Sequence, residues 1–151
     1  MPLSIRRAGP ADAAVVVEFN CLLAQESEGK TLDAAVVGPG VAAGLADPRK
    51  SVYFLAEEDG VAIGQIMFTT EWSDWRNGWF WWIQSVYVRP EARRRGVFRA
   101  LFEHVHQAAR ADGHVIGLRL YVERDNHIAQ DTYRRMGMDA TTYLVFERYP
   151  M

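Results

Sequence analysis

Apolar residues along the chain follow two spacings, one typical of strands and one typical of helices. Residues 3–7 predict a short strand, and residues 11–25 have the apolar spacing of a helix. The apolar positions of that helix are Val15, Val16, Phe19, Leu22 and Leu23. A second helical region over 31–46 is interrupted by Gly38-Pro39-Gly40, which predicts two short helices or one bent element.

The middle of the chain has the strongest β pattern. Residues 51–72 predict a hairpin that turns at Glu58-Asp59-Gly60, and residues 79–89 predict a strand that is nearly apolar throughout and therefore covered on both faces. A helix is expected to follow the arginines at 93–95 and to end at Asp112-Gly113. Its apolar face consists of Phe98, Leu101, Phe102, Val105 and Ala109.

The last third of the chain predicts three more elements. Residues 114–123 are expected to form a strand, and a helix capped by Asn126 is expected to end at Gly137. Residues 141–149, TTYLVFERY, predict a final strand. The expected order is β-α-α-β-β-β-α-β-α-β, a mixed α/β sheet in a single domain over residues 1–151.

Composition limits the classes of function. The chain has 151 residues, 49% hydrophobic content and a net charge of −2, which suits one domain and disfavours general nucleic-acid binding. The single cysteine, Cys21, excludes an internal disulfide and fits a reducing compartment. The N-terminal sequence MPLSIRRAG lacks an apolar core for export, and no segment approaches membrane-spanning length, so we expect a cytoplasmic protein with no membrane partner. The four histidines form no metal-ligand pattern with carboxylates or cysteine, so no metal is expected.

The sequence VRPEARRRGVFRALFEHV, residues 88–105, places three arginines before a helix. Because the helix N-terminus is already electropositive, a negative group is expected nearby. A strand, a turn with Gly96 and a helix start can direct backbone N–H groups at a phosphate, with arginine side chains as countercharge. One glycine is a weak signal, and a solvated surface run of arginines explains the same residues equally well.

Two segments together resemble the GCN5-related N-acetyltransferase (GNAT) family. VYVRPEARRRGVFRALFEHV is similar to the family's motif A, Arg/Gln-x-x-Gly-x-Gly/Ala, with Arg93 and Gly96 in register and Phe98 in place of the last small residue. NHIAQDTYRRMGM is similar to motif B, Asn-x-x-Ala-x-x-x-Tyr-x-x-x-Gly-Phe/Met. The matching residues are Asn126, Ala129, Tyr133, Gly137 and Met138. The close resemblance covers residues 83–138 and implies the GNAT-like acyl-CoA N-acyltransferase fold.

The resemblance implies that acetyl-CoA binds beside this strand. Backbone groups of Val86 and Val88 would bind the pantetheine arm, and the N–H groups of 94–98 would bind the pyrophosphate under Arg93 and Arg94. The strands 79–89 and 114–121 would splay apart to admit the thioester. The implied cofactor-binding set is Val86, Tyr87, Val88, Arg93, Arg94, Arg95, Gly96, Val97, Phe98, Asn126, Ala129 and Tyr133.

The resemblance also places Tyr133 where the family has the group that protonates the CoA sulfur. A phenol has a pKa near ~10, so it stays protonated at neutral pH and can donate a proton. The alternative is a half-buried structural tyrosine, and Asn126 likewise has a purely structural alternative as a helix N-cap.

The general base remains open at this point. Many family members carry a glutamate on the strand before the loop, where this chain has residues 81–84, WWIQ. The candidate bases are Glu26, Glu28, Glu71 and Asp74, or a water chain to the backbone. For each carboxylate alone, an exposed surface charge is the simpler interpretation.

Five tryptophans crowd into residues 72–82. Together with Glu71 and Asp74 they are compatible with an aromatic, acidic pocket for a cation. A hydrophobic core combined with a homodimer contact explains them equally well. The predicted substrate-binding set is Glu26, Glu28, Glu71, Trp72, Asp74, Trp82 and Gln84.

The leading hypothesis from the sequence is an enzyme, a transferase that acetylates a small primary amine, with a polyamine-like or amino-sugar cation as the acceptor. Acetylation of a peptide N-terminus or a lysine side chain is the alternative within the enzyme class. A non-catalytic acyl-CoA sensor is a third hypothesis, because Phe98 and the missing strand glutamate depart from the family pattern. An oligomeric ligand-binding module without CoA is a fourth.

Overall fold

The computed structural model describes residues 2–151. The chain forms two compact units, of which the first ends at Leu120 and the second covers Tyr121–Met151. The single domain expected from the sequence stays a prediction.

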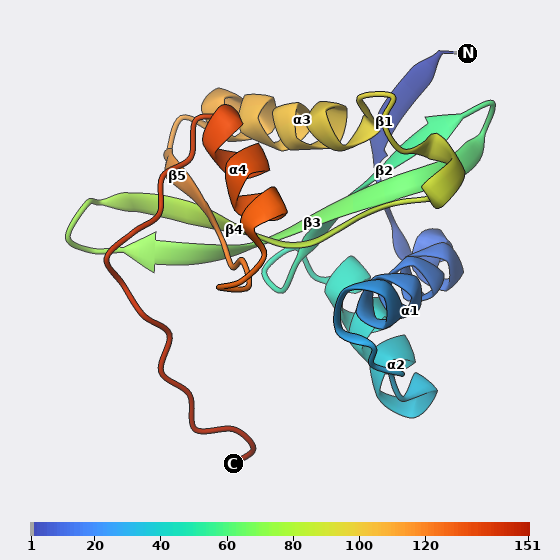
Figure 1. Ribbon diagram of the computed structural model, residues 1–151, viewed down its shortest axis with the longest axis horizontal. Coiled ribbons are helices and arrows are strands. Elements are labelled where there is room, and N and C mark those ends of the chain that lie inside the picture. Colours follow the sequence, from blue (N-terminus) through green and yellow to red (C-terminus); the bar gives the residue numbers. More distant parts are fainter. Residues whose placement is uncertain (1) are drawn as a thin grey trace. The chain divides into compact units, whose positions relative to one another are not determined.

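The first unit contains a five-stranded mixed sheet (Figure 1). The strands, in chain order and in sheet order alike, are β1 (Leu3–Arg7), β2 (Val52–Glu58), β3 (Val61–Ser73), β4 (Gly78–Val88) and β5 (Val115–Leu120). Neighbouring strands are antiparallel, except that β4 and β5 are parallel. A parallel pair requires a crossover connection, and the helix α3 (Val97–Asp112) supplies it.

Helices cover both faces of this sheet (Figure 1). One face carries α1 (Ala13–Glu28) and α2 (Ala34–Ala46), which follow a short 3-10 turn, η1 (Pro10–Asp12). Tyr53 and Leu55 of β2 pack there with Phe19 of α1. Phe54 points to the opposite face, because successive side chains of a strand alternate, and its ring meets His104 of α3 at 4.6 Å.

The expected hairpin is confirmed. Asp59 and Gly60, between β2 and β3, both have positive φ angles, of 53° and 76°. This is the backbone that a two-residue hairpin turn requires, and a glycine adopts it without a Cβ clash.

Helix α2 is one continuous helix through Pro39, so of the two forms expected from the sequence the pair of short helices is wrong. Val37, Val41 and Leu45 recur at a spacing of four and all pack against the core beside α1. Asp33 caps the helix, its Oδ1 accepting from the N–H of Ala35 at 2.9 Å. Packing and the cap outweigh the lost hydrogen bond at proline.

The second unit contains one helix, α4 (His127–Arg135). The Oδ1 atom of Asn126 accepts from the N–H of Ala129 at 3.1 Å, which confirms the expected N-cap. Gly137, with φ of 89°, follows the helix end as expected.

The final strand expected over 141–149 is wrong, because the structure assigns no strand there. Leu144, Val145 and Phe146 are 72%, 66% and 91% exposed. A strand is stable only when it pairs with a neighbouring strand. The apolar pattern of these residues indicates strand propensity but does not indicate which strand would pair with them. Within residues 2–151, no helix is both long enough and apolar enough to cross a membrane.

Candidate functional site

The end of β4 has an open edge. The pairing of β4 with β5 runs from Trp79 to Ile83, which aligns with Leu120, while β4 itself continues to Val88. Residues 84–88 therefore extend past the registered pairs with β5. Strand β5 itself ends at Leu120, and the splaying of the two strands that the family resemblance implied stays a prediction.

Backbone groups of Val86 and Val88 face that open edge. The N–H of Arg89 donates to the carbonyl of Ile63 in β3 at 2.8 Å. Because polar backbone groups alternate sides along an antiparallel strand, those of Val86 and Val88 point away from β3. The carbonyl of Val88 accordingly accepts a hydrogen bond from Nε of Arg93 at 2.9 Å.

A β-bulge lies immediately before this segment. Met67 aligns with Ser85 and Phe68 with Ile83, so Gln84 is the extra residue. Its Nε2 atom donates to Oγ1 of Thr69 at 3.0 Å. Bulges interrupt ladder pairing and re-aim side chains, and they are frequent beside active sites.

The loop after β4 turns sharply before α3. It begins with the 3-10 turn η2 (Pro90–Ala92), and Arg94 and Gly96 then have positive φ angles of 65° and 81°. Gly96 is the N-cap of α3 and provides no side-chain hydrogen bond there, so the first N–H groups of the helix are available to an anion. A Cβ at Gly96 would meet nothing within 4 Å, so the glycine is required for its backbone angle and not for space inside the chain.

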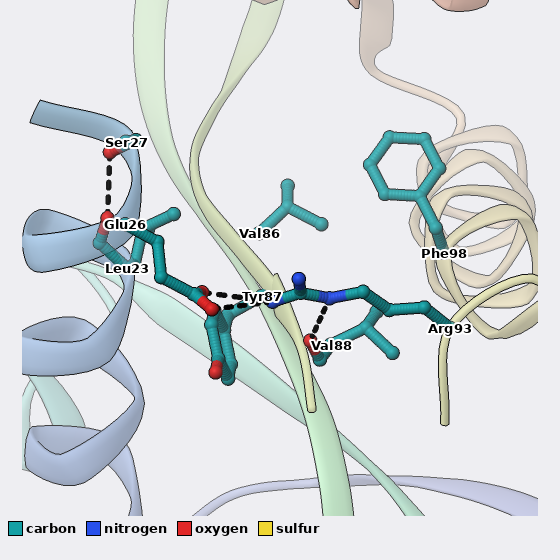
Figure 2. A pocket seen from close by; sticks show the side chains of 8 residues that line it. All are labelled: Leu23, Glu26, Ser27, Val86, Tyr87, Val88, Arg93 and Phe98. Atoms are coloured by element: carbon teal, nitrogen blue, oxygen red, sulfur yellow. Dashed lines mark hydrogen bonds and ion pairs between the residues drawn. The ribbon is translucent and has the colours of Figure 1, made fainter. Parts of the chain in front are cut away.

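A pocket of about 370 Å³ lies between α1, the end of β4 and the start of α3 (Figure 2). Three elements far apart in the sequence therefore build one concave surface. Its lining residues are Leu23, Glu26, Ser27, Val86, Tyr87, Val88, Arg93 and Phe98.

Arg93 crosses this pocket (Figure 2). Its Nη2 atom donates to Oε2 of Glu26 at 2.8 Å and to Oε1 at 3.1 Å, while its Nε holds the Val88 carbonyl. The guanidinium lies 5.5 Å from the ring centroid of Tyr87. Burial raises the pKa of the Tyr87 hydroxyl, and the negative charge of Glu26 raises it further.

The arginine run is partly neutralised by the chain itself. Arg93 pairs with Glu26, and Arg95 pairs with Glu58 of β2 at 2.7 Å. Arg94 lies exposed between them in the left-handed backbone conformation. The negative groups expected near the three arginines are therefore in part carboxylates of this chain, Glu26 and Glu58. Of the three arginines, Arg94 is the one placed to bind an external anion.

The tryptophan hairpin differs from the expected cation pocket. The guanidinium of Arg119 lies 3.6 Å from the ring centroid of Phe80, and its Nη1 donates to Oε1 of Glu71 at 3.0 Å. Arg76 also lies over Phe80, at 5.5 Å. Arginines of the chain therefore occupy the place proposed for an external cation at Glu71.

The tryptophans differ in how far they are exposed. Trp81 stacks on Phe68 with ring centroids 3.9 Å apart, which makes it part of the packing under α3. Trp72 packs edge-on against Trp79 and is 49% exposed, and Trp75 at the tip is 88% exposed.

The predicted substrate residues do not share one place. Glu26 lines the pocket, whereas Glu28 forms an exposed ion pair with Lys30. Glu71, Trp72 and Asp74 belong to the hairpin at the far end of β4, and a strand rises about 3.3 Å per residue, so Trp79 and Val88 are roughly 30 Å apart. Trp82 and Gln84 lie between these ends, beside the bulge.

The motif B residues lie in the second unit. Asn126 and Ala129 are joined by the cap hydrogen bond, and Tyr133 follows Asn126 after seven residues, two helical turns on. Burial raises the pKa of the Tyr133 hydroxyl, so it remains protonated at neutral pH.

Sequence reasoning missed two of the residues that line the pocket, Leu23 and Ser27. Leu23 was assigned to the apolar stripe of α1, and Ser27 carries no motif. Leu23 lies three residues before Glu26 and four before Ser27 on one helix, and these spacings were the available signal because such residues share a face.

Comparisons with known proteins show the family to which the chain belongs. Residues 23–138, more than half of the chain, match the family described as the acetyltransferase (GNAT) family. The chain belongs to this family, a class of acetyl-CoA-dependent N-acetyltransferases, and its fold and recognition motifs agree with that class.

Individual relatives point the same way. A crystal structure of a possible acetyltransferase from Clostridium difficile 630 shares 42% sequence identity, covers 100% of this chain and 99% of its own, and superposes with a TM-score of 0.94. Mycothiol acetyltransferase of Mycolicibacterium gilvum is 41% identical over 61 residues, which span 38% of this chain and only 20% of that protein. An aminoglycoside N-acetyltransferase in complex with CoA shares the fold, with a TM-score of 0.80 at 18% identity and coverage of 99% and 96% of the two chains.

Proposed function

We propose that this chain transfers the acetyl group of acetyl-CoA to the primary amine of a small cationic molecule. The observation that carries the proposal is the open edge of β4 at Val86 and Val88, which leads directly into the left-handed loop before α3. A pocket of about 370 Å³ lies along this path.

These residues fit an acyl-CoA. Outward-facing backbone groups at Val86 and Val88 match the amides of a pantetheine arm, and the N–H groups of residues 94–98 match a pyrophosphate. The cofactor supplies the activated acetyl group. Arg94 provides countercharge. Arg93 can bind an anion only if its guanidinium also keeps its ion pair with Glu26 or breaks that pair.

Phe98 sets the local shape of this proposed site. It stands in the wall of the pocket, where the family pattern has a small residue. Its N–H belongs to the first turn of α3 and remains oriented toward an anion. The bulky ring narrows the pocket beside Val86, which favours an acyl donor as slender as acetyl.

In the proposed reaction Tyr133 donates a proton to the departing thiolate. Its raised pKa keeps the hydroxyl protonated over the neutral range. Asn126 fixes the start of α4 through its cap and with Ala129 holds the helix that carries Tyr133. We place the protein in the cytoplasm, as its single cysteine favours.

For the acceptor amine we propose the surface of β4 beside the bulge, near Trp82 and Gln84. The half-buried indole of Trp82 offers cation–π attraction, which an amine would share with Arg119, whose guanidinium lies 5.8 Å from the ring centroid. The interrupted ladder at Gln84 supplies polar groups. Glu26 provides a carboxylate at the other side of the same segment. The general base is drawn from Glu26 or from a water molecule, because Glu26 lines the pocket whereas Glu71 belongs to the hairpin at the far end of β4. Glu26 can act as a base only when its ion pair with Arg93 opens.

The test is a panel of amines assayed for release of free CoA, with a reaction lacking any amine as the background. The panel contains polyamines, amino sugars, amino acids and a peptide with a free N-terminus and a lysine. Turnover confined to the small cations supports the proposal. Turnover of the peptide alone would contradict the proposal and indicate that the enzyme acetylates protein amines. CoA binding without turnover of any amine would indicate a non-catalytic acyl-CoA sensor.

A further inference from the structure

Two arginine–carboxylate pairs join α1 to the end of β4. Arg89 pairs with Glu18 at 2.9 Å, and Arg93 pairs with Glu26 at 2.8 Å. Arg89 has further anchors, because its Nε donates to a backbone carbonyl of β3 at 3.0 Å and its guanidinium lies 4.7 Å from the ring centroid of Phe19. The Arg93 side chain is 44% exposed, against 24% for Arg89. Exposed ion pairs stabilise a protein little, so the pair of Arg93 with Glu26 is the one that can exchange partners.

The contacts of the Arg93 guanidinium describe a site for a cation. Its Nη2 atom meets both carboxylate oxygens of Glu26, at 2.8 and 3.1 Å, and the guanidinium lies 5.5 Å from the ring centroid of Tyr87. Figure 2 shows Arg93 reaching across the pocket to Glu26, with Tyr87 beside the carboxylate. A carboxylate and the face of an aromatic ring both attract ammonium and guanidinium cations. An external cation would therefore find the same two partners once Arg93 moved away.

An acyl-CoA in the proposed position would draw Arg93 away from Glu26. The Nε atom of Arg93 donates to the carbonyl of Val88 at 2.9 Å, and this carbonyl is one of the groups proposed to bind the pantetheine arm. The diphosphate would bind the next residues of the loop, 94–98. A guanidinium fork binds phosphate oxygens as well as it binds a carboxylate. The cofactor therefore competes both for the guanidinium and for the carbonyl that the arginine holds.

We propose that Glu26 and Tyr87 form a subsite for a second positive charge of the acceptor, and that Arg93 fills this subsite until acyl-CoA binds. When the guanidinium turns to the diphosphate, the carboxylate and the ring are left for a cation of the acceptor. The inference rests on the proposed function and adds that CoA and a dicationic amine bind cooperatively. Because Glu26 then holds the charge that does not react, a water molecule is the base at the reacting amine.

The distance from this subsite to the reacting position selects the acceptor. Tyr87 follows the bulge residue Gln84 by three positions, and a strand rises about 3.3 Å per residue, so the two places are roughly 10 Å apart. A linear molecule with an amine at each end can reach both places, whereas a compact monoamine reaches only one. The acceptor class is therefore a linear diamine or polyamine.

The experiment measures the Kd of hexamethylenediamine by calorimetry with and without saturating CoA, which has no acetyl group to transfer. In the wild-type chain CoA should tighten diamine binding about tenfold, and the diamine should tighten CoA binding by the same factor, because coupling between two sites is reciprocal. Equal diamine affinity with and without CoA would overturn the proposal. This measurement needs no turnover, so it is separate from the test of the proposed function.

Two variants separate exchange at Arg93 from the general attraction between an anionic cofactor and a cation. Glu26→Gln removes the charge of the subsite, so CoA should change diamine affinity by less than about twofold. Arg93→Gln empties the subsite, so the diamine should bind about tenfold more tightly than it binds the wild type, even without CoA. Glu18→Gln is the matched control, because it removes the same charge from the pair with Arg89 and should keep the coupling.

Circular dichroism of each variant checks that its fold is intact. Coupling that persists in a folded Glu26→Gln protein would overturn the proposal. A folded Arg93→Gln protein whose diamine affinity without CoA is not raised would overturn it as well, and so would loss of the coupling in Glu18→Gln.

Steady-state kinetics of CoA release then compares hexamethylenediamine with hexylamine, which has the same carbon chain and one amine fewer. The wild type should favour the diamine about tenfold in kcat/KM, and Glu26→Gln should reduce this preference to within about twofold. Equal use of the two amines by the wild type would overturn the subsite and leave acetyl transfer itself standing. Coupled binding without turnover of either amine would support the subsite and contradict the proposed function.

Discussion

Arg93 and Glu26 are 67 positions apart in the sequence, yet Nη2 of Arg93 lies 2.8 Å from Oε2 of Glu26 across the candidate pocket. The same guanidinium holds the carbonyl of Val88 through Nε. One arginine thus joins the end of α1, the end of β4 and the loop before α3. Any anion bound by that loop competes with Glu26 for Arg93.

The first prediction concerns Glu26→Gln. The substitution removes a negative charge beside the proposed pyrophosphate position and frees the Arg93 guanidinium. We expect CoA to bind about threefold to tenfold more tightly at low salt, with a smaller gain at high salt because exposed charges are screened. Calorimetric titration at two salt concentrations measures this.

Glu28→Gln is the matched control, since it removes the same charge two residues away, where Glu28 pairs with Lys30. Stability should change by less than about 1 kcal/mol in either variant, because both ion pairs are exposed. Weaker CoA binding in Glu26→Gln would mean that Glu26 positions Arg93 for the cofactor and does not compete with it.

The second prediction concerns Gly96→Glu. A side chain there meets no atom of the chain but lies beside the N–H groups of α3, so a carboxylate should repel phosphate and weaken CoA binding at least about tenfold. Gly113→Glu is the control at the other end of the same helix, with nearly the same φ, 82° against 81°. Both variants should lose roughly 1 kcal/mol of stability from the left-handed backbone, and only the first should lose CoA. Equal CoA affinity for the two folded variants would show that the pyrophosphate does not bind at this loop.

Many elements of both units follow from the sequence because local patterns suffice for them. The turn at Asp59-Gly60, the buried stripe of α3 and the Asn126 cap each depend on residues within a few positions of one another. The hydrophobic period and the cap chemistry are local signals. The unbroken α2 was missed because its continuity depends on Val41 packing into a core built by α1 and β2.

The candidate site was predictable only in part, for the same reason. The loop at Arg93 and Gly96 was found through its motif. The partners of the arginines were not, because Glu26 and Glu58 lie 67 and 37 positions from Arg93 and Arg95, respectively. The pairing of Glu71 with Arg119 is likewise a product of the parallel β4–β5 register. Charge pairs of this kind are decided by topology, which no short pattern encodes.

The third prediction places the acceptor. Trp82→Phe should raise KM for an accepted amine about tenfold with little change in CoA affinity, because the indole lies beside the bulge at Gln84. Trp75→Ala should leave both constants within about twofold, since Trp75 is 88% exposed at the hairpin tip. Steady-state kinetics of CoA release measures both. A larger increase in KM for Trp75→Ala than for Trp82→Phe would indicate that the acceptor binds at the hairpin.

The fourth prediction concerns alkaline pH. Burial raises the pKa of Tyr53 above its usual 10.0, although a hydrogen bond with Asn20 offsets part of the effect. The folded state therefore keeps this proton at pH values where the unfolded state has lost it. The stabilisation is complete below pH 10 and is lost as the pH rises through the folded pKa, by up to about 1.4 kcal/mol per pH unit.

Urea unfolding at pH 8, 9, 10 and 11 tests this. Stability should be flat to pH 9 and fall above pH 10. The fall should be shallower in Tyr53→Phe and unchanged in Tyr149→Phe, which removes a hydroxyl from a side chain that is 84% exposed. If the free energy of unfolding falls equally steeply with pH in all three proteins, groups other than Tyr53 cause the loss of stability at alkaline pH.

The last prediction concerns Tyr133→Phe. The substitution keeps the ring and its packing in α4, so the fold and acetyl-CoA affinity should survive. Loss of the proton donor should lower kcat on the order of 10²–10⁴-fold, because the thiolate then leaves unprotonated. Tyr143→Phe, in the same unit, is the control and should keep normal kcat. If the chemical step limits the rate, the gap in kcat between wild type and variant should narrow as the pH rises, because the CoA thiolate is then stable without a proton. A near-normal kcat in a folded Tyr133→Phe protein would make Tyr133 a structural residue of α4 and assign protonation of the thiolate to water.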